Sequence, residues 1–167
     1  MRALVAYGSK RGGTEGLAFQ VADGLRAEGF VVDARPAGDV HEIGSFDVVI
    51  LGGALYAGRW HKAARRLATR HAAELREHPI YFFSSGPLDA SAVQGDIPPV
   101  RGVADLMRRV GARGHVTFGG RLSPYARGFP ASAMAKRRAG DWRDPGQVHD
   151  WTRRIAAELR AGRPVRA

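Results

Sequence analysis

A loop rich in glycine and hydroxyl groups lies near the start of the sequence and reads Gly8-Ser9-Lys10-Arg11-Gly12-Gly13-Thr14. Residues 2–7 before it are mostly apolar, and apolar residues recur at helical spacing over residues 15–28 after it. The pattern predicts a strand, a tight polar loop and a helix. Such a loop directs backbone N–H groups and hydroxyls at the positive end of a helix, so it could hold a phosphate without a charged side chain.

Three familiar phosphate-binding loops do not fit this stretch. Thr14 and Glu15 stand where a triphosphate loop carries its lysine after the last glycine. The glycine spacing is not that of a dinucleotide fingerprint, and the absence of cysteine excludes a cysteine-phosphatase loop. The remaining alternative is an ordinary glycine-rich turn between a strand and a helix, with no ligand.

Two further loops rich in glycine or serine follow predicted strands. Residues 46–52 form a continuous apolar run, typical of a strand buried on both faces, and lead into a loop over residues 52–58. Residues 79–84 predict another strand, which leads into a loop over residues 85–89. Ligands of parallel sheets bind outside the carboxyl ends of the strands, at the point where the strand order reverses. The three loops are therefore expected to form one site.

The other predicted elements alternate in the same way. Strands are expected over residues 30–35 and 115–119, and helices over residues 61–76 and 101–110. Gly29 is a natural stop for the first helix, and Asp144 is expected to cap a last helix, with Gln147 completing a capping box. The alternation predicts an α/β fold with a parallel sheet. With no internal repeat or linker, residues 1–167 are expected to form a single domain.

The composition narrows the classes of partner and site. The chain has 26 Lys and Arg against 16 Asp and Glu, a formal charge of +10. This charge could attract an anionic partner such as lipid or nucleic acid. We favour the alternative that the basic residues are solvated helix faces, and expect no nucleic acid, because no aromatic residues are interleaved with them. The absence of cysteine excludes disulfides and thiolate metal sites, and no metal site is predicted. No run is long enough to span a membrane and the chain enters a strand without a signal-peptide pattern, so a cytoplasmic location is expected.

Taken together, the three loops resemble the FMN site of flavodoxins. Residues 3–15 resemble the phosphate loop of that family, which usually reads S/T-x-S/T-G-x-T. Residues 51–63 are most similar to the flavodoxin-like protoporphyrinogen dehydrogenases, which pass electrons to quinones: the strand ends in glycine, and an aromatic residue, a glycine, a histidine and a basic helix follow. The resemblance covers nearly the whole chain. It implies a three-layer sandwich around a five-stranded parallel sheet in the order 2-1-3-4-5.

The resemblance also implies a set of cofactor-binding residues, and FMN as the cofactor. The phosphate would be held by Ser9, Lys10, Arg11, Gly12, Gly13 and Thr14. One face of the ring would be lined by Leu55, Tyr56, Ala57 and Gly58, and its other edge by Ser85, Gly86, Pro87 and Leu88. Tyr56 is the expected stacking aromatic, with Trp60 as its competitor. No side chain is recognisable as a general acid or base, so no catalytic residue is predicted.

Three functions follow from this resemblance and stay open at this point. The first is an FMN oxidoreductase acting on a small-molecule substrate or a quinone, as in the protoporphyrinogen dehydrogenases. The second is a basic flavodoxin that carries electrons to a redox protein, and the third is a flavin-free binding module. The third loop supplies no aromatic residue, and Arg59, together with Arg121 or Arg127, is expected near the ring, which favours two-electron chemistry. Residues 123–140, which carry Tyr125 and Phe129, would be the place of any membrane contact.

Overall fold

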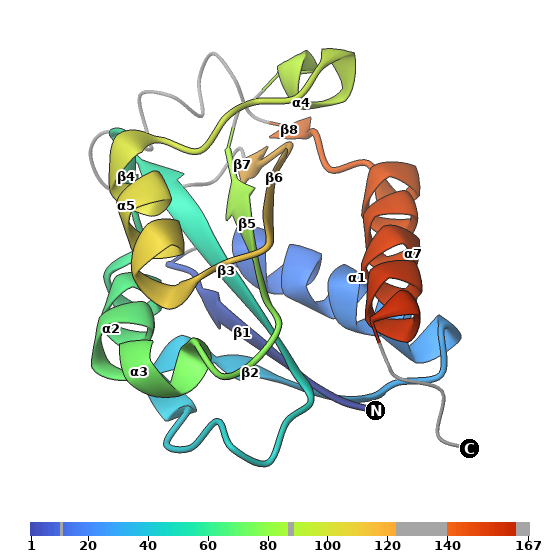
Figure 1. Ribbon diagram of the computed structural model, residues 1–167. Coiled ribbons are helices and arrows are strands. Elements are labelled where there is room, and N and C mark those ends of the chain that lie inside the picture. Colours follow the sequence, from blue (N-terminus) through green and yellow to red (C-terminus); the bar gives the residue numbers. More distant parts are fainter. Residues whose placement is uncertain (11, 87–88, 123–139, 163–167) are drawn as a thin grey trace.

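A computed structural model describes residues 1–10, 12–86, 89–122 and 140–162 of the chain (Figure 1). The predictions made for Arg11, Pro87 and Leu88, and those for residues 123–139, lie outside the described residues.

Five parallel strands form the centre of the molecule, in the order β2-β1-β3-β5-β6. When only these strands are counted along the chain, this is the predicted order 2-1-3-4-5, so the flavodoxin-like α/β fold is confirmed. A sixth strand, β4, pairs antiparallel with the end of β3. The bounds are β1 (Arg2–Gly8), β2 (Val31–Pro36), β3 (Val48–Tyr56), β4 (Arg59–Trp60), β5 (Ile80–Ser85) and β6 (Gly114–Phe118).

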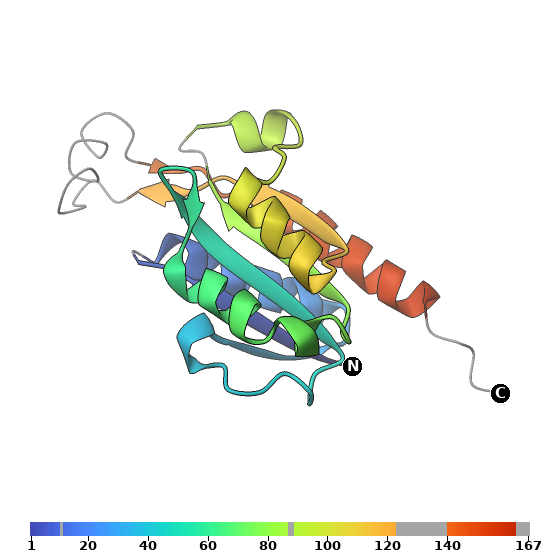
Figure 2. The same ribbon diagram turned by 60° about the vertical axis from the view of Figure 1, so that its left-hand side comes forward.

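Helices cover both faces of this sheet. The helices α1 (Gly13–Ala27) and α7 (Pro145–Ala161) pack against each other on one face. The opposite face is covered by α2 (Lys62–Arg70), α3 (Ala72–Leu75) and α5 (Arg101–Val110) (Figures 1 and 2). Along β1, Ala3 and Val5 contribute to the first core and Leu4 and Ala6 to the second, because successive side chains of a strand point to opposite faces.

The ends of the two helices on the first face agree largely with the expected signals. Gly29 has a φ of +84°, the left-handed conformation that ends a helix after its last turn. Asp144 caps α7 by accepting hydrogen bonds from the N–H groups of Gly146 and Gln147. The predicted capping box is not completed, because the Gln147 amide donates to the carbonyl oxygen of Ala92 at 2.7 Å instead.

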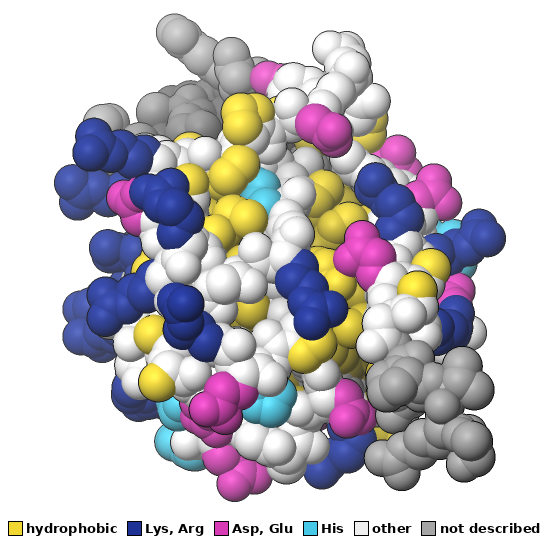
Figure 3. Space-filling model, in the orientation of Figure 1, with side chains coloured by type: hydrophobic (Ala, Val, Ile, Leu, Met, Phe, Trp, Pro, Cys, Tyr) yellow, Lys and Arg dark blue, Asp and Glu magenta, His cyan; other side chains and the backbone are white. Residues whose placement is uncertain are grey.

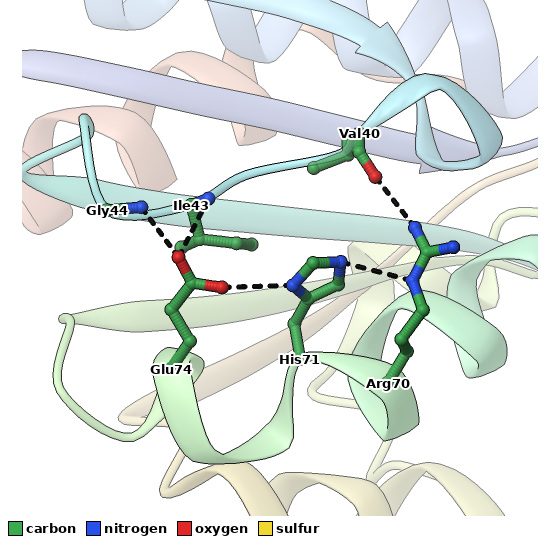
Figure 4. A network of polar contacts seen from close by, with 6 residues as sticks. All are labelled: Val40, Ile43, Gly44, Arg70, His71 and Glu74. Carbon is green, nitrogen blue, oxygen red and sulfur yellow. Dashed lines mark hydrogen bonds and ion pairs between the residues drawn. The ribbon is translucent and has the colours of Figure 1, made fainter.

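The predicted helix over residues 61–76 is divided into α2 and α3 at His71 (Figure 4). His71 Nδ1 lies 3.0 Å from Glu74 Oε2, and the other carboxylate oxygen of Glu74 accepts from the N–H groups of Ile43 and Gly44. Arg70 donates to the carbonyl oxygen of Val40 at 2.8 Å. His71 is thus a structural residue in a network that attaches the connection before β3 to the helical layer.

Several short elements have no counterpart among the predicted ones. They are too short to produce a periodic pattern of apolar residues. The short elements are η1 (Ala37–Asp39), β4, α4 (Ser91–Gln94), and the antiparallel pair β7 (Arg121–Leu122) and β8 (Gly140–Asp141).

Within the described part of the chain, no helix is long and apolar enough to cross a membrane.

Candidate functional site

The carboxyl ends of β1, β3 and β5 lie level with one another at one edge of the sheet, which we call the rim (Figure 1). Gly8 is paired with Gly53, and Gly53 is paired in turn with Ser84. The first and third loops leave the sheet near these positions, whereas β3 continues to Tyr56, so that only Ala57 and Gly58 of the predicted second loop form the turn. The register therefore brings them to one place, as the parallel arrangement predicted.

The first loop turns sharply into the N-terminus of α1. Gly12 has a φ of +77°, a conformation that side chains other than glycine rarely adopt. Its N–H donates to Ser9 Oγ at 3.1 Å, and its carbonyl accepts the N–H of Gly16 at 3.0 Å. No side chain of the described residues caps this helix. Its first N–H groups therefore face the loop, where the helix dipole favours an anion.

Thr14 carries an unpartnered hydroxyl at this helix end. The residue is 1% exposed, and its Oγ1 has no hydrogen-bond partner among the described residues. Burial of a hydroxyl without a partner costs about 1–3 kcal/mol. A phosphate oxygen at the first turn of α1 would accept this hydrogen bond as well as those of the helix amides. The residues present at this loop thus fit a phosphate group.

Tyr7 and Glu15 connect the strand before this loop with the helix after it. The Tyr7 hydroxyl donates to Glu15 Oε1 at 2.9 Å. Burial, followed by the hydrogen bond to Glu15, raises the pKa of Tyr7 to about 12. The phenol therefore stays protonated and keeps donating throughout the physiological range of pH.

His61 lies between the first loop and the second. A β-carbon built on Gly8 would come 2.8 Å from His61 Nδ1, so only glycine fits beneath the imidazole. The N–H of His61 donates to the carbonyl of Ala54 at 2.8 Å, and Nδ1 accepts the N–H of Ala63 at the start of α2. Burial, together with the positive charges of Lys10 and Arg65, holds the pKa of His61 below its usual value.

The second loop is a tight hairpin between β3 and β4. Ala57 and Gly58, its central residues, both have positive φ angles, of 47° and 71°, as a two-residue hairpin turn of the favoured type requires. Tyr56 is 40% exposed beside this turn. Trp60 is buried instead: its indole N–H donates to Ser84 Oγ at 3.0 Å and its ring packs on Phe82. Tyr56 is therefore the aromatic residue that the hairpin leaves accessible.

The third loop begins at Ser85, which is buried, and Gly86. The N–H of Gly86 donates to the carbonyl of Phe118 at 3.0 Å, and a β-carbon on Gly86 would come 2.8 Å from Thr117 Cγ2. Gly86 is thus fixed against the end of β6, with its amide proton already engaged. Pro87 and Leu88 lie outside the described residues.

A fourth group of residues lies beside the first loop, and of its members only Arg121 was expected from the sequence. The guanidinium of Arg143 lies against Gly16 of α1, and the backbone carbonyl of Arg121 would come 3.3 Å from a β-carbon on Gly13. Asp141 contacts both arginines. Its pKa is lowered, chiefly by the hydrogen bond from Arg143. The guanidinium of Arg143 and the backbone of Arg121 thus lie beside the N-terminal half of α1, and the only sequence signal for Arg143 was a glycine inside a helical pattern.

A separate cavity of about 350 Å³ runs along β6, between residues 95–99 and α7. It shares no residue with the three loops. His115 lines it, and burial lowers the pKa of this histidine from 6.5 to about 4. His115 Nε2 lies 2.9 Å from Ser84 Oγ, which also accepts the indole N–H of Trp60. The neutral imidazole is therefore part of a polar network between the two helical layers.

Comparison with known proteins agrees with this architecture. The family model for the flavodoxin domain matches residues 4–123. No curated protein matches the chain.

Solved structures share the fold at low sequence identity. A cysteine-to-serine mutant of flavodoxin from Pseudomonas aeruginosa is 16% identical with a TM-score of 0.61, and the match covers 96% of this chain and 99% of that one. A flavodoxin from Streptococcus pneumonia TIGR4 is 17% identical with a TM-score of 0.58, again over 96% and 99% of the two chains. Rubredoxin oxygen:oxidoreductase from Desulfovibrio gigas is 16% identical with a TM-score of 0.61, over 96% of this chain but 36% of that longer one.

Proposed function

The chain belongs to the flavodoxin-domain family, and we propose that it transfers electrons through an FMN held by the three loops of the rim. FMN is the cofactor that membership of this family implies. When bound, FMN supplies the capacity to accept and release one or two electrons. The observation that supports the site most directly is the buried, unpartnered hydroxyl of Thr14 at the uncapped N-terminus of α1. We further propose that residues 1–167 act as one domain, since α7 packs on α1 beyond the matched stretch.

The phosphate end of the cofactor is assigned to the first loop. The N–H groups at the start of α1 and the hydroxyls of Ser9 and Thr14 are the donors, and Lys10 and Arg11 add positive charge. Gly12 and Gly13 let the backbone approach the anion. The remainder of this site is the backbone of Gly8, held in place by His61.

The ring end is assigned to the other two loops. Tyr56 offers an accessible aromatic face, flanked by Leu55, Ala57 and Gly58 of the hairpin. On the other side the assignment comprises Ser85, Gly86, Pro87 and Leu88. These residues bind, orient and partly shield the ring, while the exchange of electrons belongs to the cofactor.

Absorbance of the purified protein tests this function. We expect flavin bands in the preparation, or uptake of added FMN by the apoprotein with quenching of flavin fluorescence. A protein that is folded by circular dichroism, yet neither contains flavin nor takes up FMN at millimolar concentration, would contradict the proposal and favour a flavin-free binding module.

A second candidate is a quinone-linked oxidation of protoporphyrinogen. Support for it comes from residues 51–63, which resemble the dehydrogenases of that reaction, and from the lack of an aromatic residue in the third loop. Turnover of protoporphyrinogen IX with a water-soluble quinone by the FMN-loaded protein would support this candidate. Exchange of electrons with a redox protein, without such turnover, would identify a basic electron carrier.

A further inference from the structure

Lysine and arginine side chains gather on the side of the molecule formed by β4, α2 and α5 (Figure 3). These three elements are neighbours, because α5 contacts both β4 and α2. All the basic side chains that they carry are exposed. We call this surface the basic face, and its residues are Arg59, Lys62, Arg65, Arg66, Arg70, Arg101, Arg108 and Arg109.

The basic face carries eight cations and one carboxylate, a net charge of +7, in a chain whose total charge is +10. The only carboxylate within the three elements is that of Asp105, which contacts Arg108. On other parts of the surface some arginines have acidic partners, as in the pairs Arg26–Asp23 and Arg160–Glu28, whereas Arg153 and Arg154 form no ion pair with the described residues. Among the described residues, no ion pair is formed by Arg59, Lys62, Arg65 or Arg66.

The arrangement of these charges is unfavourable for α2 itself. Lys62 and Arg66, and then Arg66 and Arg70, are four residues apart, where like charges destabilise a helix by about 0.2–0.5 kcal/mol per pair. Lys62 also lies in the first turn, which has no acidic residue and where the helix dipole disfavours a cation. A helix that needed only a solvated outer face would be more stable with mixed charges. The repulsion is relieved when an anionic surface covers the helix.

The basic face reaches the rim at the hairpin. Arg59 is paired directly with Tyr56 across β3 and β4, and α2 begins shortly after Trp60. Lys10 of the first loop and Arg65 of α2 both act on His61 electrostatically. A molecule docked on the basic face would therefore border the hairpin whose accessible tyrosine we assign to the flavin ring.

We propose that the basic face is the docking surface for an acidic redox protein that exchanges electrons with this chain. This proposal rests on the proposed function, because the docked partner can exchange electrons only if the chain transfers electrons through FMN. Carboxylates around the redox centre of the partner would pair with the unpaired cations and place that centre beside the hairpin. A membrane surface is less suited, because Tyr56 is the only large apolar side chain that is exposed in β3, β4, α2 and α5. A single-stranded nucleic acid would need further aromatic residues among the cations.

A matched pair of double variants tests the docking surface. R65Q/R66Q removes two adjacent arginines from α2, and R153Q/R154Q removes two adjacent arginines from α7 on the opposite face of the sheet. Both variants have the same net charge, and all four side chains are exposed. A difference between them therefore reports where the partner binds, independently of net charge.

The probe is a small acidic [2Fe–2S] ferredoxin. Basic cytochrome c, a redox protein of the opposite charge, is measured for comparison. Binding of the ferredoxin is followed by titration calorimetry on the protein as purified, and electron transfer by stopped flow on the FMN-loaded protein. For the wild type, we expect the association rate with ferredoxin to fall at least about tenfold between low and physiological ionic strength. The rate with cytochrome c should rise or stay constant. R65Q/R66Q should weaken ferredoxin binding roughly threefold to tenfold, and R153Q/R154Q less than twofold.

Three results would overturn the docking surface. The first is an equal loss of binding in both double variants, which would indicate an effect of net charge alone. The second is no ferredoxin binding by the wild type at low ionic strength. The third is binding to phosphatidylcholine vesicles with phosphatidylglycerol, lost in R65Q/R66Q, without binding to ferredoxin. Because calorimetry requires no flavin, a chain that fails to take up FMN contradicts the proposed function and leaves the test of the basic face valid.

Discussion

The imidazole of His61 lies on the backbone of Gly8, so closely that a β-carbon there would be 2.8 Å from Nδ1. His61 begins the helical layer on one side of the sheet, and Gly8 ends β1 before the first loop. Through this contact the position of the hairpin and that of the phosphate loop depend on each other. Changes at either residue should therefore affect both stability and the binding of FMN.

Gly8→Ala should destabilise the protein by about 1–3 kcal/mol, because the added methyl group meets His61 and the N–H of Ala64. FMN affinity should fall as well, since relief of the contact moves the two loops apart. Urea denaturation and FMN titration measure the two effects. Gly102→Ala is the control: nothing lies within 4 Å of its β-carbon, and the change to alanine within α5 should leave stability unchanged or raise it. Equal stability and equal FMN affinity of the two variants would contradict the close contact between Gly8 and His61.

Thr14→Val should have opposite effects on stability and on binding. The valine has nearly the same shape and removes an unpartnered buried hydroxyl, so the apoprotein should be as stable or up to about 1 kcal/mol more stable. FMN affinity should fall about tenfold, because one donor to the phosphate is lost. Thr152→Val is the matched control: that buried hydroxyl donates to the carbonyl of His149, so its removal should destabilise the apoprotein. An unchanged FMN affinity in Thr14→Val would argue against the phosphate assignment.

Tyr56→Ala should weaken FMN binding with little loss of stability, because this side chain is 40% exposed. The expected loss of affinity is about threefold to tenfold, from the contact between the two aromatic systems. Trp60→Phe should do the reverse: it keeps an aromatic ring in the core but leaves Ser84 without the indole N–H, so stability should fall. Denaturation and flavin titration of both variants check the two roles. If Trp60→Phe lowered the free energy of FMN binding more than the free energy of unfolding, Trp60 rather than Tyr56 would be assigned to the flavin ring.

His115 should make the protein less stable in mild acid. Its pKa in the folded state is about 4 because the ring is buried, against 6.5 for an exposed histidine. The unfolded chain therefore binds more protons between these values, and stability that is complete above pH 6.5 is lost as the pH falls toward 4. The loss is on the order of 2 kcal/mol, and the lowered pKa of His61 acts in the same direction.

The measurement is the urea midpoint of the wild type and of His115→Gln at pH 7.5 and 5. The variant should be less stable than the wild type at the higher pH, since the contact with Ser84 is altered, but should show a smaller dependence on pH. An identical pH dependence in both proteins would exclude His115 as its source.

Glu74→Ala should destabilise the protein by about 1–3 kcal/mol. It removes the acceptor of the Ile43 and Gly44 N–H groups and the partner of His71 (Figure 4). Glu77→Ala is the control, because this exposed side chain forms no hydrogen bond or ion pair with the described residues. Thermal unfolding of both variants distinguishes the network from a general effect of lost charge, which would lower the two midpoints equally.

Much of this architecture could be predicted from local patterns. The helix over residues 101–110 has the bounds that its pattern predicts, and Gly29 and Asp144 act at the helix ends as expected. Continuous apolar runs identified β3 and β5, because a strand covered by helices on both sides has no polar face. The three rim loops followed from the alternation of strands and helices, since the ends of parallel strands must meet at one edge.

The remaining features depend on which segments meet in space. Nothing near Trp60 in the sequence indicates that its indole N–H reaches Ser84, and nothing near Arg143 indicates that it lies on Gly16. The side chain of Gln147 had a local partner available in the capping box, yet it donates to Ala92. Short-range periodicity and capping come from the geometry of one segment, so the sequence determined the elements, their order and the place of the rim. Packing and hydrogen bonds between distant segments depend on the whole chain, so only the tertiary structure decided which side chains are buried there and which stay free to bind.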